Sequence, residues 1–430
     1  MKKTISLLLF FCIISAFSGQ ISAQTMPKDA DKKLWEKALQ IQRKAVIVDG
    51  HNDITSPMVD EDLDLSANTV GKFHRDGDPF HTDLARFKAS GITAEFFSIY
   101  VSGTDYQKGG KMRRAMELID ATNREIEKHP AQLTACTTAA DIRQAKKQNK
   151  ICALMGIEGG YVIENSLYAL RNFYRLGIRY MTLTHNVSHD WADAHRGEVK
   201  NNGLSDFGKE VVREMNRLGM LVDISHVSDK VMNDVLDIST APVIASHSGA
   251  RGVANHTRNV PDDVLKRVAK NGGVIMINFY PSFLDERTNR EENERSAKLK
   301  SQIDGLREIY KNDPNGFNEA ERKLLNENPI YIASYTRIVD HIDHIKKTVG
   351  IDYVGLGSDF DGVPFLPEGM NGMEDLVLVT YEMLKRGYSE TEIRKVLGEN
   401  FLRAFAQAEA VAKIGTRKIS ADGSLKKIGK

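Results

Sequence analysis

The sequence has few cysteines, no excess of charge of either sign and no internal repeat. Three Cys among 430 residues exclude a small fold built from disulfides, and a hydrophobic content of 41% is enough for a large buried core. The formal net charge is +1, so no electrostatic attraction to nucleic acid or to an anionic membrane is expected. This composition is typical of a large globular protein that does not bind nucleic acid.

The sequence also lacks a convincing membrane span at its N-terminus. The apolar run over residues 5–17 is shorter than the roughly 20 residues that a spanning helix needs. It follows Lys2 and Lys3 and precedes the small residues of Ile21-Ser22-Ala23, as in a cleavable signal peptide. We therefore predict a signal peptide in residues 1–23, export to the periplasm or the medium, and no membrane anchor after cleavage. A retained anchor is the alternative.

Only Cys136 and Cys152 remain after such a cleavage. They could pair in an oxidising compartment, but the sequence does not fix the distance between them. Cys152 lies in an apolar strand pattern, where a free Cys packs as a small hydrophobic residue. We therefore expect the two thiols to be unpaired.

Eight short apolar segments alternate with helical patterns along the chain. They predict strands at residues 45–49, 93–100, 151–157, 179–184, 220–224, 242–246, 273–278 and 353–358. Most show little polar alternation, as expected for strands that are covered on both faces. The order of strands and helices predicts a single (β/α)₈ barrel, a TIM-like α/β fold, over residues 24–412. An open, doubly wound sheet is the alternative.

Helix-capping residues and charge patterns predict the structure of three further segments. Ser205 predicts the start of a helix that Gly219 ends. The highly charged residues 285–323 predict a solvated helical insertion before the eighth strand, placed over the barrel mouth; an exposed hairpin without function is the alternative. The basic residues 413–430 predict a flexible tail.

A polar residue that could bind metal follows six of the eight predicted strands. These residues are His51 with Asp53, Glu158, His185, His226, His247 and Asp359. An open sheet concentrates its site at one switch point, whereas a closed ring brings all the strand ends together. The distribution of these residues therefore favours the barrel.

Histidine and carboxylate side chains are natural zinc ligands, and a pair of ions needs roughly five or six of them with one that bridges. His51 and Asp53 lie on the same side of extended chain and can reach one ion. We expect His226 and His247 on a second ion and Glu158 between the two. A water held there would lose its proton near neutral pH and become the nucleophile.

Each predicted ligand also has a simpler interpretation. Asp53 could make only an Asx turn, and Glu158 could cap a nearby helix. A single His at a strand end is more often a hydrogen-bonded loop residue than a ligand. Independent loop residues have no reason to recur at the same end of successive strands, so the coincidence favours a metal site.

Seven segments, in order, resemble the signatures of the renal (membrane) dipeptidase family of zinc-dependent dipeptidases. They are residues 49–53, 156–160, 183–186, 223–228, 242–248, 257–263 and 357–362. The resemblance extends from about Ala45 to Phe405. It implies an enzyme that hydrolyses dipeptides on a (β/α)₈ barrel, with two zinc ions per chain on the ligands proposed above.

The resemblance also implies roles for three further groups. His185 would stabilise the oxyanion, Arg258 would hold the substrate's free carboxylate, and Asp359 would pass the proton of the water to the leaving amine. Arg suits this task because its planar fork grips a carboxylate through two hydrogen bonds. Alternatively, His185 is a metal ligand, and Arg258 pairs with Asp262 or Asp263 at a helix start.

Two other functions are alternatives. A related barrel amidohydrolase, acting on cyclic amides or β-lactams, usually carries His-x-His after the first strand, whereas this chain has His51-Asn52-Asp53. A non-catalytic zinc-binding envelope protein would need neither Arg258 nor Asp359. The sequence does not fix which dipeptides are preferred, and it is compatible with the homodimers that relatives often form.

Overall fold

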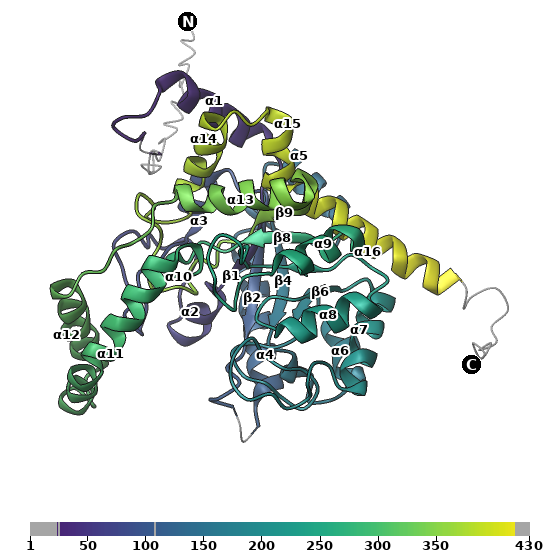
Figure 1. The fold of residues 1–430 in the computed structure, drawn as a ribbon, viewed down its shortest axis with the longest axis horizontal. Coiled ribbons are helices and arrows are strands. Elements are labelled where there is room, and N and C mark those ends of the chain that lie inside the picture. The colour runs from purple at the N-terminus through teal and green to yellow at the C-terminus, as the bar shows by residue number, and fades with distance from the viewer. Residues whose placement is uncertain (1–23, 25, 107–108, 418–430) are drawn as a thin grey trace, which may run out of the picture.

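The computed structural model describes residues 24, 26–106 and 109–417 (Figure 1). The predicted signal peptide, residues 1–23, lies outside the described residues. The last helix, α16 (Asn400–Arg417), extends into the segment that was predicted as a tail, and residues 418–430 lie outside the description.

Eight parallel strands form a closed barrel at the centre of the molecule. They are β1 (Val48–Asn52), β2 (Ala94–Tyr100), β4 (Ile151–Glu158), β5 (Ile178–Thr182), β6 (Leu221–Asp223), β7 (Ile244–Ala245), β8 (Val274–Ile277) and β9 (Val354–Leu356). The ring closes because β1 pairs with both β2 and β9, and β2 pairs with β4. The predicted (β/α)₈ barrel is confirmed, with strand boundaries shifted by a few residues.

A short ninth strand corrects the expectation for the two cysteines. The strand β3 (Leu133–Ala135) was missed, and it pairs with the start of β4, where Thr134 lies opposite Cys152. This pairing brings Cys136, the residue that follows β3, beside Cys152, with 5.5 Å between their Cα atoms. The two cysteines form a disulfide, so the prediction of free thiols was wrong.

Helices surround the barrel (Figure 1). They are α1 (Lys32–Lys44), α2 (Thr55–Asp60), α3 (Leu84–Ser90), α4 (Lys111–Lys128), α5 (Ala139–Lys147), α6 (Leu167–Arg175), α7 (Asp206–Leu218), α8 (Asp229–Ile238), α9 (Asp262–Asn271), α10 (Pro281–Leu284), α13 (Thr336–Val349), α14 (Val377–Lys385), α15 (Glu390–Arg394) and α16. The prediction for α7 is confirmed: Ser205 caps its first turn, and Gly219 ends it in a left-handed conformation at φ +83°. None of the described helices combines the length and apolar character of a membrane span.

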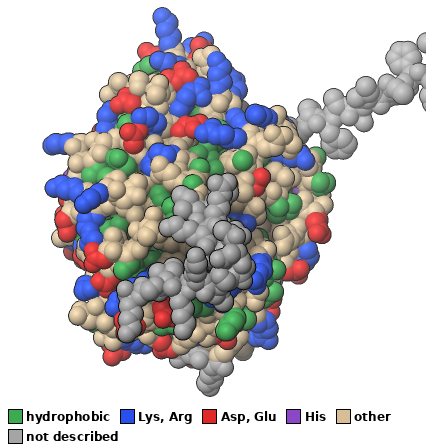
Figure 2. All heavy atoms as spheres, turned by 90° about the vertical axis from the view of Figure 1, so that its right-hand side faces the viewer, with side chains coloured by type: hydrophobic (Ala, Val, Ile, Leu, Met, Phe, Trp, Pro, Cys, Tyr) green, Lys and Arg blue, Asp and Glu red, His purple; other side chains and the backbone are tan. Residues whose placement is uncertain are grey.

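The charged insertion is helical, as predicted. It consists of α11 (Glu286–Ile309) and α12 (Pro314–Glu327), which project from one side of the barrel (Figure 1). The first turns of α11 reach the cavity at the barrel mouth, where Asn289, Glu292 and Asn293 line it. On the face shown in Figure 2, acidic and basic side chains are interspersed, in keeping with the net charge of +1.

Apolar side chains fill the barrel from its amino end. Phe401 of α16 packs on Phe96 of β2, with ring centroids 5.4 Å apart, and Tyr180 lies 4.8 Å from the same ring. Gly156 makes room for Tyr180, because a Cβ at this position would lie 2.1 Å from the Tyr180 ring. The amino end is therefore packed, and the polar residues gather at the carboxyl end.

Candidate metal centre

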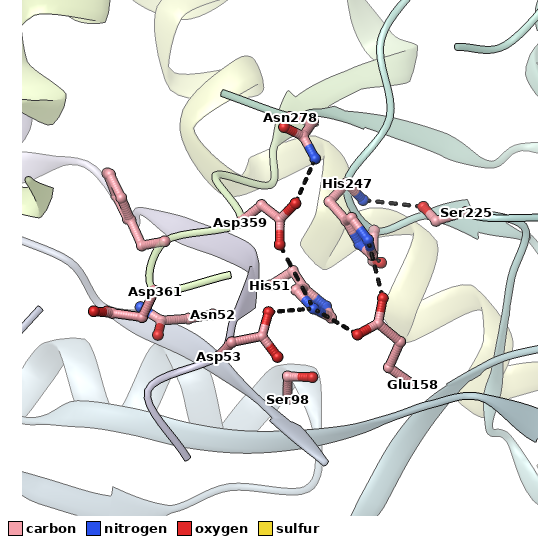
Figure 3. Close-up of polar contacts among 12 residues, drawn as sticks. His51, Asn52, Asp53, Ser98, Glu158, Ser225, His247, Asn278, Asp359 and Asp361 are labelled. Carbon is pink, nitrogen blue, oxygen red and sulfur yellow. Dashed lines mark hydrogen bonds and ion pairs between the residues drawn. The ribbon is translucent and has the colours of Figure 1, made fainter. Parts of the chain in front are cut away.

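The residues predicted to hold the first zinc ion lie close together at the end of β1. The Nε2 atom of His51 lies 3.2 Å from Asp53 Oδ2, 3.5 Å from Glu158 Oε2 and 4.0 Å from Asp359 Oδ1 (Figure 3). His51 is fully buried, and its other ring nitrogen, Nδ1, is 2.7 Å from the hydroxyl of Tyr180. This contact holds the ring so that Nε2 faces the three carboxylates.

The second predicted site lies on the other side of Glu158. Its Oε1 atom is 3.0 Å from His226 Nε2 and 3.3 Å from His247 Nε2. The two carboxylate oxygens of Glu158 therefore face two different sets of histidines, which is the arrangement expected of a bridging ligand.

The backbone is strained where it presents some of these side chains. His226, Asp359 and Asp361 have φ values of +63°, +65° and +60°, a left-handed region that non-glycine residues rarely adopt. Such strain concentrates at functional sites, where the surrounding structure enforces it. Asp359 is fixed further by Asn278, whose amide donates to its Oδ2 over 2.8 Å (Figure 3).

Burial shifts the pKa of several residues in the cluster. It lowers the pKa of both His226 and His247 well below the usual value, and the positive charge of Arg258 adds to the effect. Burial, together with the charges of Asp53 and Asp359 and against the opposing effect of His51, raises the pKa of Glu158 to about 7. The neutral imidazoles of His226 and His247 beside crowded carboxylates form an environment that a cation stabilises.

The residues present fit divalent metal ions. Three overlapping groups bring their ligand atoms within 4.8 Å of one another: His51, Asp53 and Glu158; Glu158, His226 and His247; and His51, His247 and Asp359. Two buried atoms at this place, His51 Nε2 and Asp53 Oδ1, have no hydrogen-bond partner among the residues that the structure describes. Nitrogen and carboxylate donors of this kind suit zinc. A further group, Asp64, Glu125 and His129, lies elsewhere and already has Lys128 Nζ 2.7 Å from Glu125 Oε1.

His185 lies beside the metal ligands rather than among them. Its ring centroid is 4.4 Å from that of His226 and 4.9 Å from that of Tyr100. Within the described chain, no group of potential ligands that could share one ion contains it. Burial and the charge of Arg258 lower the pKa of His185 to about 3, so the ring is neutral and can donate a hydrogen bond.

Arg258 is a buried cation that forms no ion pair with any acidic side chain in the described part of the chain. It is 2% exposed, and it donates to Ser248 Oγ over 3.2 Å and to the His247 carbonyl over 3.0 Å. Its Nε atom has no partner, and burial lowers its pKa to about 10. Within the described residues no ion pair joins it to Asp262 or Asp263, and Asp262 pairs with His344 instead. The guanidinium therefore keeps hydrogen-bonding capacity that no acidic group of the described residues uses.

A cavity of about 550 Å³ opens directly onto this cluster. Asp53, Glu158, His185, His226 and Asp359 all line it. The sequence did not predict the residues that contact the predicted site residues from the side away from the cavity. Tyr180 contacts His51, Asn278 contacts Asp359, and Ser246, which binds Asp223, contacts His247. Asp223 and Ser246 lie inside two of the recognised segments, but neither has metal-ligand spacing.

The sequence model of the membrane dipeptidases, peptidase family M19, matches residues 35–418. The chain belongs to this family. It is accordingly a metallo-dipeptidase, as the resemblance of its seven segments implied. The match runs across the barrel and all the candidate ligands.

Solved structures of similar proteins agree with this assignment. The probable dipeptidase PvdM from Pseudomonas aeruginosa is 25% identical, with a TM-score of 0.73 over 88% of this chain and 99% of that one. Two further structures share the fold at 24% identity and a TM-score of 0.66, covering 85% of this chain and 98% and 99% of theirs. They are the metallopeptidase dipeptidase AC, and a metallopeptidase from Rhodobacter sphaeroides bound to a phosphinate mimic of the dipeptide L-Ala-D-Ala.

Proposed function

We propose that this family member is an exported dipeptidase that works with two zinc ions, one on His51 and Asp53 and one on His226 and His247. Glu158 carries the proposal, because its Oε2 faces His51 at 3.5 Å while its Oε1 faces His226 at 3.0 Å. A carboxylate in that position could hold both ions at once.

Zinc at this place would supply Lewis acidity and an activated water for attack on the peptide carbonyl. The protein groups around the cavity then handle the charges of the reaction. The neutral His185 ring donates a hydrogen bond to the developing oxyanion. This hydrogen bond is stronger than it would be in water because a buried site has a low dielectric constant. Asp359 accepts the proton of the water and gives it to the leaving amine, a role suited to a carboxylate whose pKa burial has raised.

Arg258 would select the length of the substrate. Its guanidinium forms no ion pair with a carboxylate of residues 24, 26–106 or 109–417, and its carbon Cζ lies 5.3 Å from the ring centroid of Phe283, a cavity residue. A free α-carboxylate can complete its hydrogen bonds, whereas the internal residue of a longer peptide cannot. Support for a dipeptide comes from the similar Rhodobacter sphaeroides protein, which holds a mimic of L-Ala-D-Ala.

Two observations support export. The first residues have the charge, apolar core and small-residue site of a signal peptide. Cys136 and Cys152 form a disulfide, and such bonds persist in oxidising compartments such as the periplasm. Fractionation of cells that express the full chain tests this, and a processed protein beginning near Gln24 outside the cytoplasm is the expected result.

The catalytic proposal is tested with purified protein and a panel of dipeptides, tripeptides and dipeptide amides. We expect hydrolysis of the dipeptides, loss of activity on chelation and recovery with zinc. Zinc binding without hydrolysis of any dipeptide would instead support a non-catalytic zinc protein.

A further inference from the structure

The buried carboxylate of Asp223 lies directly beneath the second predicted metal site. It ends β6, is 0% exposed, and receives hydrogen bonds from both neighbouring strand ends. Its Oδ1 accepts from the backbone N–H of Ser225 over 3.0 Å and from that of Ser246 over 2.8 Å. Its Oδ2 accepts from the hydroxyls of Thr182 and Ser246, the latter over 2.6 Å.

Ser246 connects this aspartate to the ring of His247. The Ser246 hydroxyl is 2.6 Å from Asp223 Oδ2 and 2.7 Å from His247 Nδ1. The opposite ring atom, His247 Nε2, faces Glu158 and His226. The chain of contacts therefore runs from a fixed negative charge through one hydroxyl to the far side of a predicted ligand.

The donors and acceptors allow only one consistent direction for the hydrogen bonds that join Asp223, Ser246 and His247. Asp223 can only accept, so the single proton of Ser246 Oγ goes to Asp223 Oδ2. The Ser246 oxygen then accepts from His247, which places the imidazole proton on Nδ1. Nε2 is left with a free lone pair, the state that a metal ligand requires.

We propose that Asp223 and Ser246 are positioning residues that fix the tautomer of His247 for binding the second metal ion. The inference rests on the proposed function for the role of His247. It goes further because it assigns control of metal affinity to two residues that are not themselves predicted metal ligands.

An Asp223→Asn substitution reverses the hydrogen bonds without changing the shape of the side chain. The two backbone N–H groups at Oδ1 hold the amide oxygen at that position, so the amide nitrogen takes the place of Oδ2. This nitrogen donates to Ser246 Oγ, and the Ser246 proton turns to His247 Nδ1. The imidazole proton then moves to Nε2 and blocks the metal.

The structure supplies a matched control on the other side of the barrel. Asp49 accepts from the backbone N–H of Ser358 over 2.7 Å and from the Ser358 hydroxyl, the same pattern that joins Asp223 to Ser246. Ser358 precedes Asp359 as Ser246 precedes His247, but no histidine Nδ1 contacts the Ser358 hydroxyl among the described residues. Ser358→Ala removes an equivalent buried bond without affecting a tautomer.

The test is a zinc titration of purified protein against a chromogenic chelator, with the melting temperature measured alongside. We expect two zinc ions in the wild type. Affinity for one of them should fall about 10- to 100-fold in Asp223→Asn and about 10-fold in Ser246→Ala, the range typical of groups that orient a metal-bound histidine. Ser358→Ala should keep both affinities within about twofold. Ser246→Ala carries the test if Asp223→Asn does not fold.

Unchanged zinc affinities in a folded Ser246→Ala protein would overturn the inference. An equal loss in Ser246→Ala and Ser358→Ala would also overturn it, because a general loss of packing would then be sufficient. A wild-type protein that binds no zinc would mean instead that the proposed function is wrong.

Discussion

His226 and His247 place their Nε2 atoms 2.8 Å apart, although the two residues are 21 positions apart in the sequence. Burial lowers the pKa of both rings well below the usual range, so neither carries a charge at neutral pH. Both nitrogens also face Oε1 of Glu158. Two nitrogen lone pairs and a carboxylate oxygen directed at one point are best satisfied by a cation.

Replacing Glu158 by Gln should remove the bridge between the two ions. We expect zinc content to fall from two ions per chain to one or fewer, because an amide offers neither the charge nor two equivalent oxygens. Hydrolysis should fall by about 10²-fold or more. The exposed Glu164 provides the control variant Glu164→Gln, and elemental analysis of both proteins checks the result. Two tightly bound ions in Glu158→Gln would contradict the bridging role.

Replacing Asp359 by Asn should separate proton transfer from metal binding. The proton acceptor is lost, so kcat should fall by about 10²- to 10⁴-fold, the range for removing a general acid–base group. Most of the zinc should remain, because His51, Asp53 and Glu158 still form a complete group. Steady-state kinetics on a dipeptide, with zinc analysis of the same sample, makes this measurement. A kcat equal to that of the wild type would remove Asp359 from the mechanism.

Replacing Arg258 by Gln should weaken substrate binding more than turnover. A charge-assisted contact contributes roughly 1.5–3 kcal/mol, so kcat/KM for a dipeptide should fall by about 10- to 100-fold, mainly through KM. The same dipeptide with an amide at its C-terminus is the matched substrate. The wild type should discriminate strongly against the amide and the variant should not. Equal discrimination by both proteins would show that another group binds the C-terminal carboxylate of the substrate.

Asp78, at the cavity wall, should make stability depend on pH. Burial, and to a smaller extent the charge of Asp76, raises its pKa from 3.8 to about 6. The folded state therefore retains a proton that the unfolded chain loses, so this residue's contribution to stability falls as pH rises from about 4 to 6. Asp78→Asn should be more stable than the wild type by about 1–2 kcal/mol at pH 7. At pH 4 the difference should nearly vanish.

Denaturant unfolding of both proteins at the two pH values checks this prediction. Asp190→Asn, at an exposed residue, is a suitable control. A stability difference that is the same at pH 4 and pH 7 would show that Asp78 is not the titrating group.

Local patterns predicted the parts of the fold that depend on local physics. Ser205 and Gly219 marked the ends of α7 because a capping hydroxyl and a left-handed glycine act within one turn. The ligands were found because each follows an apolar strand, and the barrel brings strand ends together. By contrast, β3 has only three residues and no apolar periodicity, so neither it nor the disulfide beside it could be predicted.

The residues that contact the predicted ligands were not predicted, for a different reason. Asp223 reaches Ser246 because β6 pairs with β7 in the register that sets Asp223 opposite Ile244. Tyr180 reaches His51 across the inside of the barrel. Such contacts depend on which strands are neighbours and in what register, and a single sequence does not state either.

Two zinc ions on either side of Glu158 can be located in crystals of the purified protein from diffraction data collected above and below the zinc absorption edge. We expect two anomalous peaks per chain, one beside His51 and Asp53 and one beside His226 and His247, with Glu158 between them. A single peak, or peaks at any other residues, would contradict this arrangement.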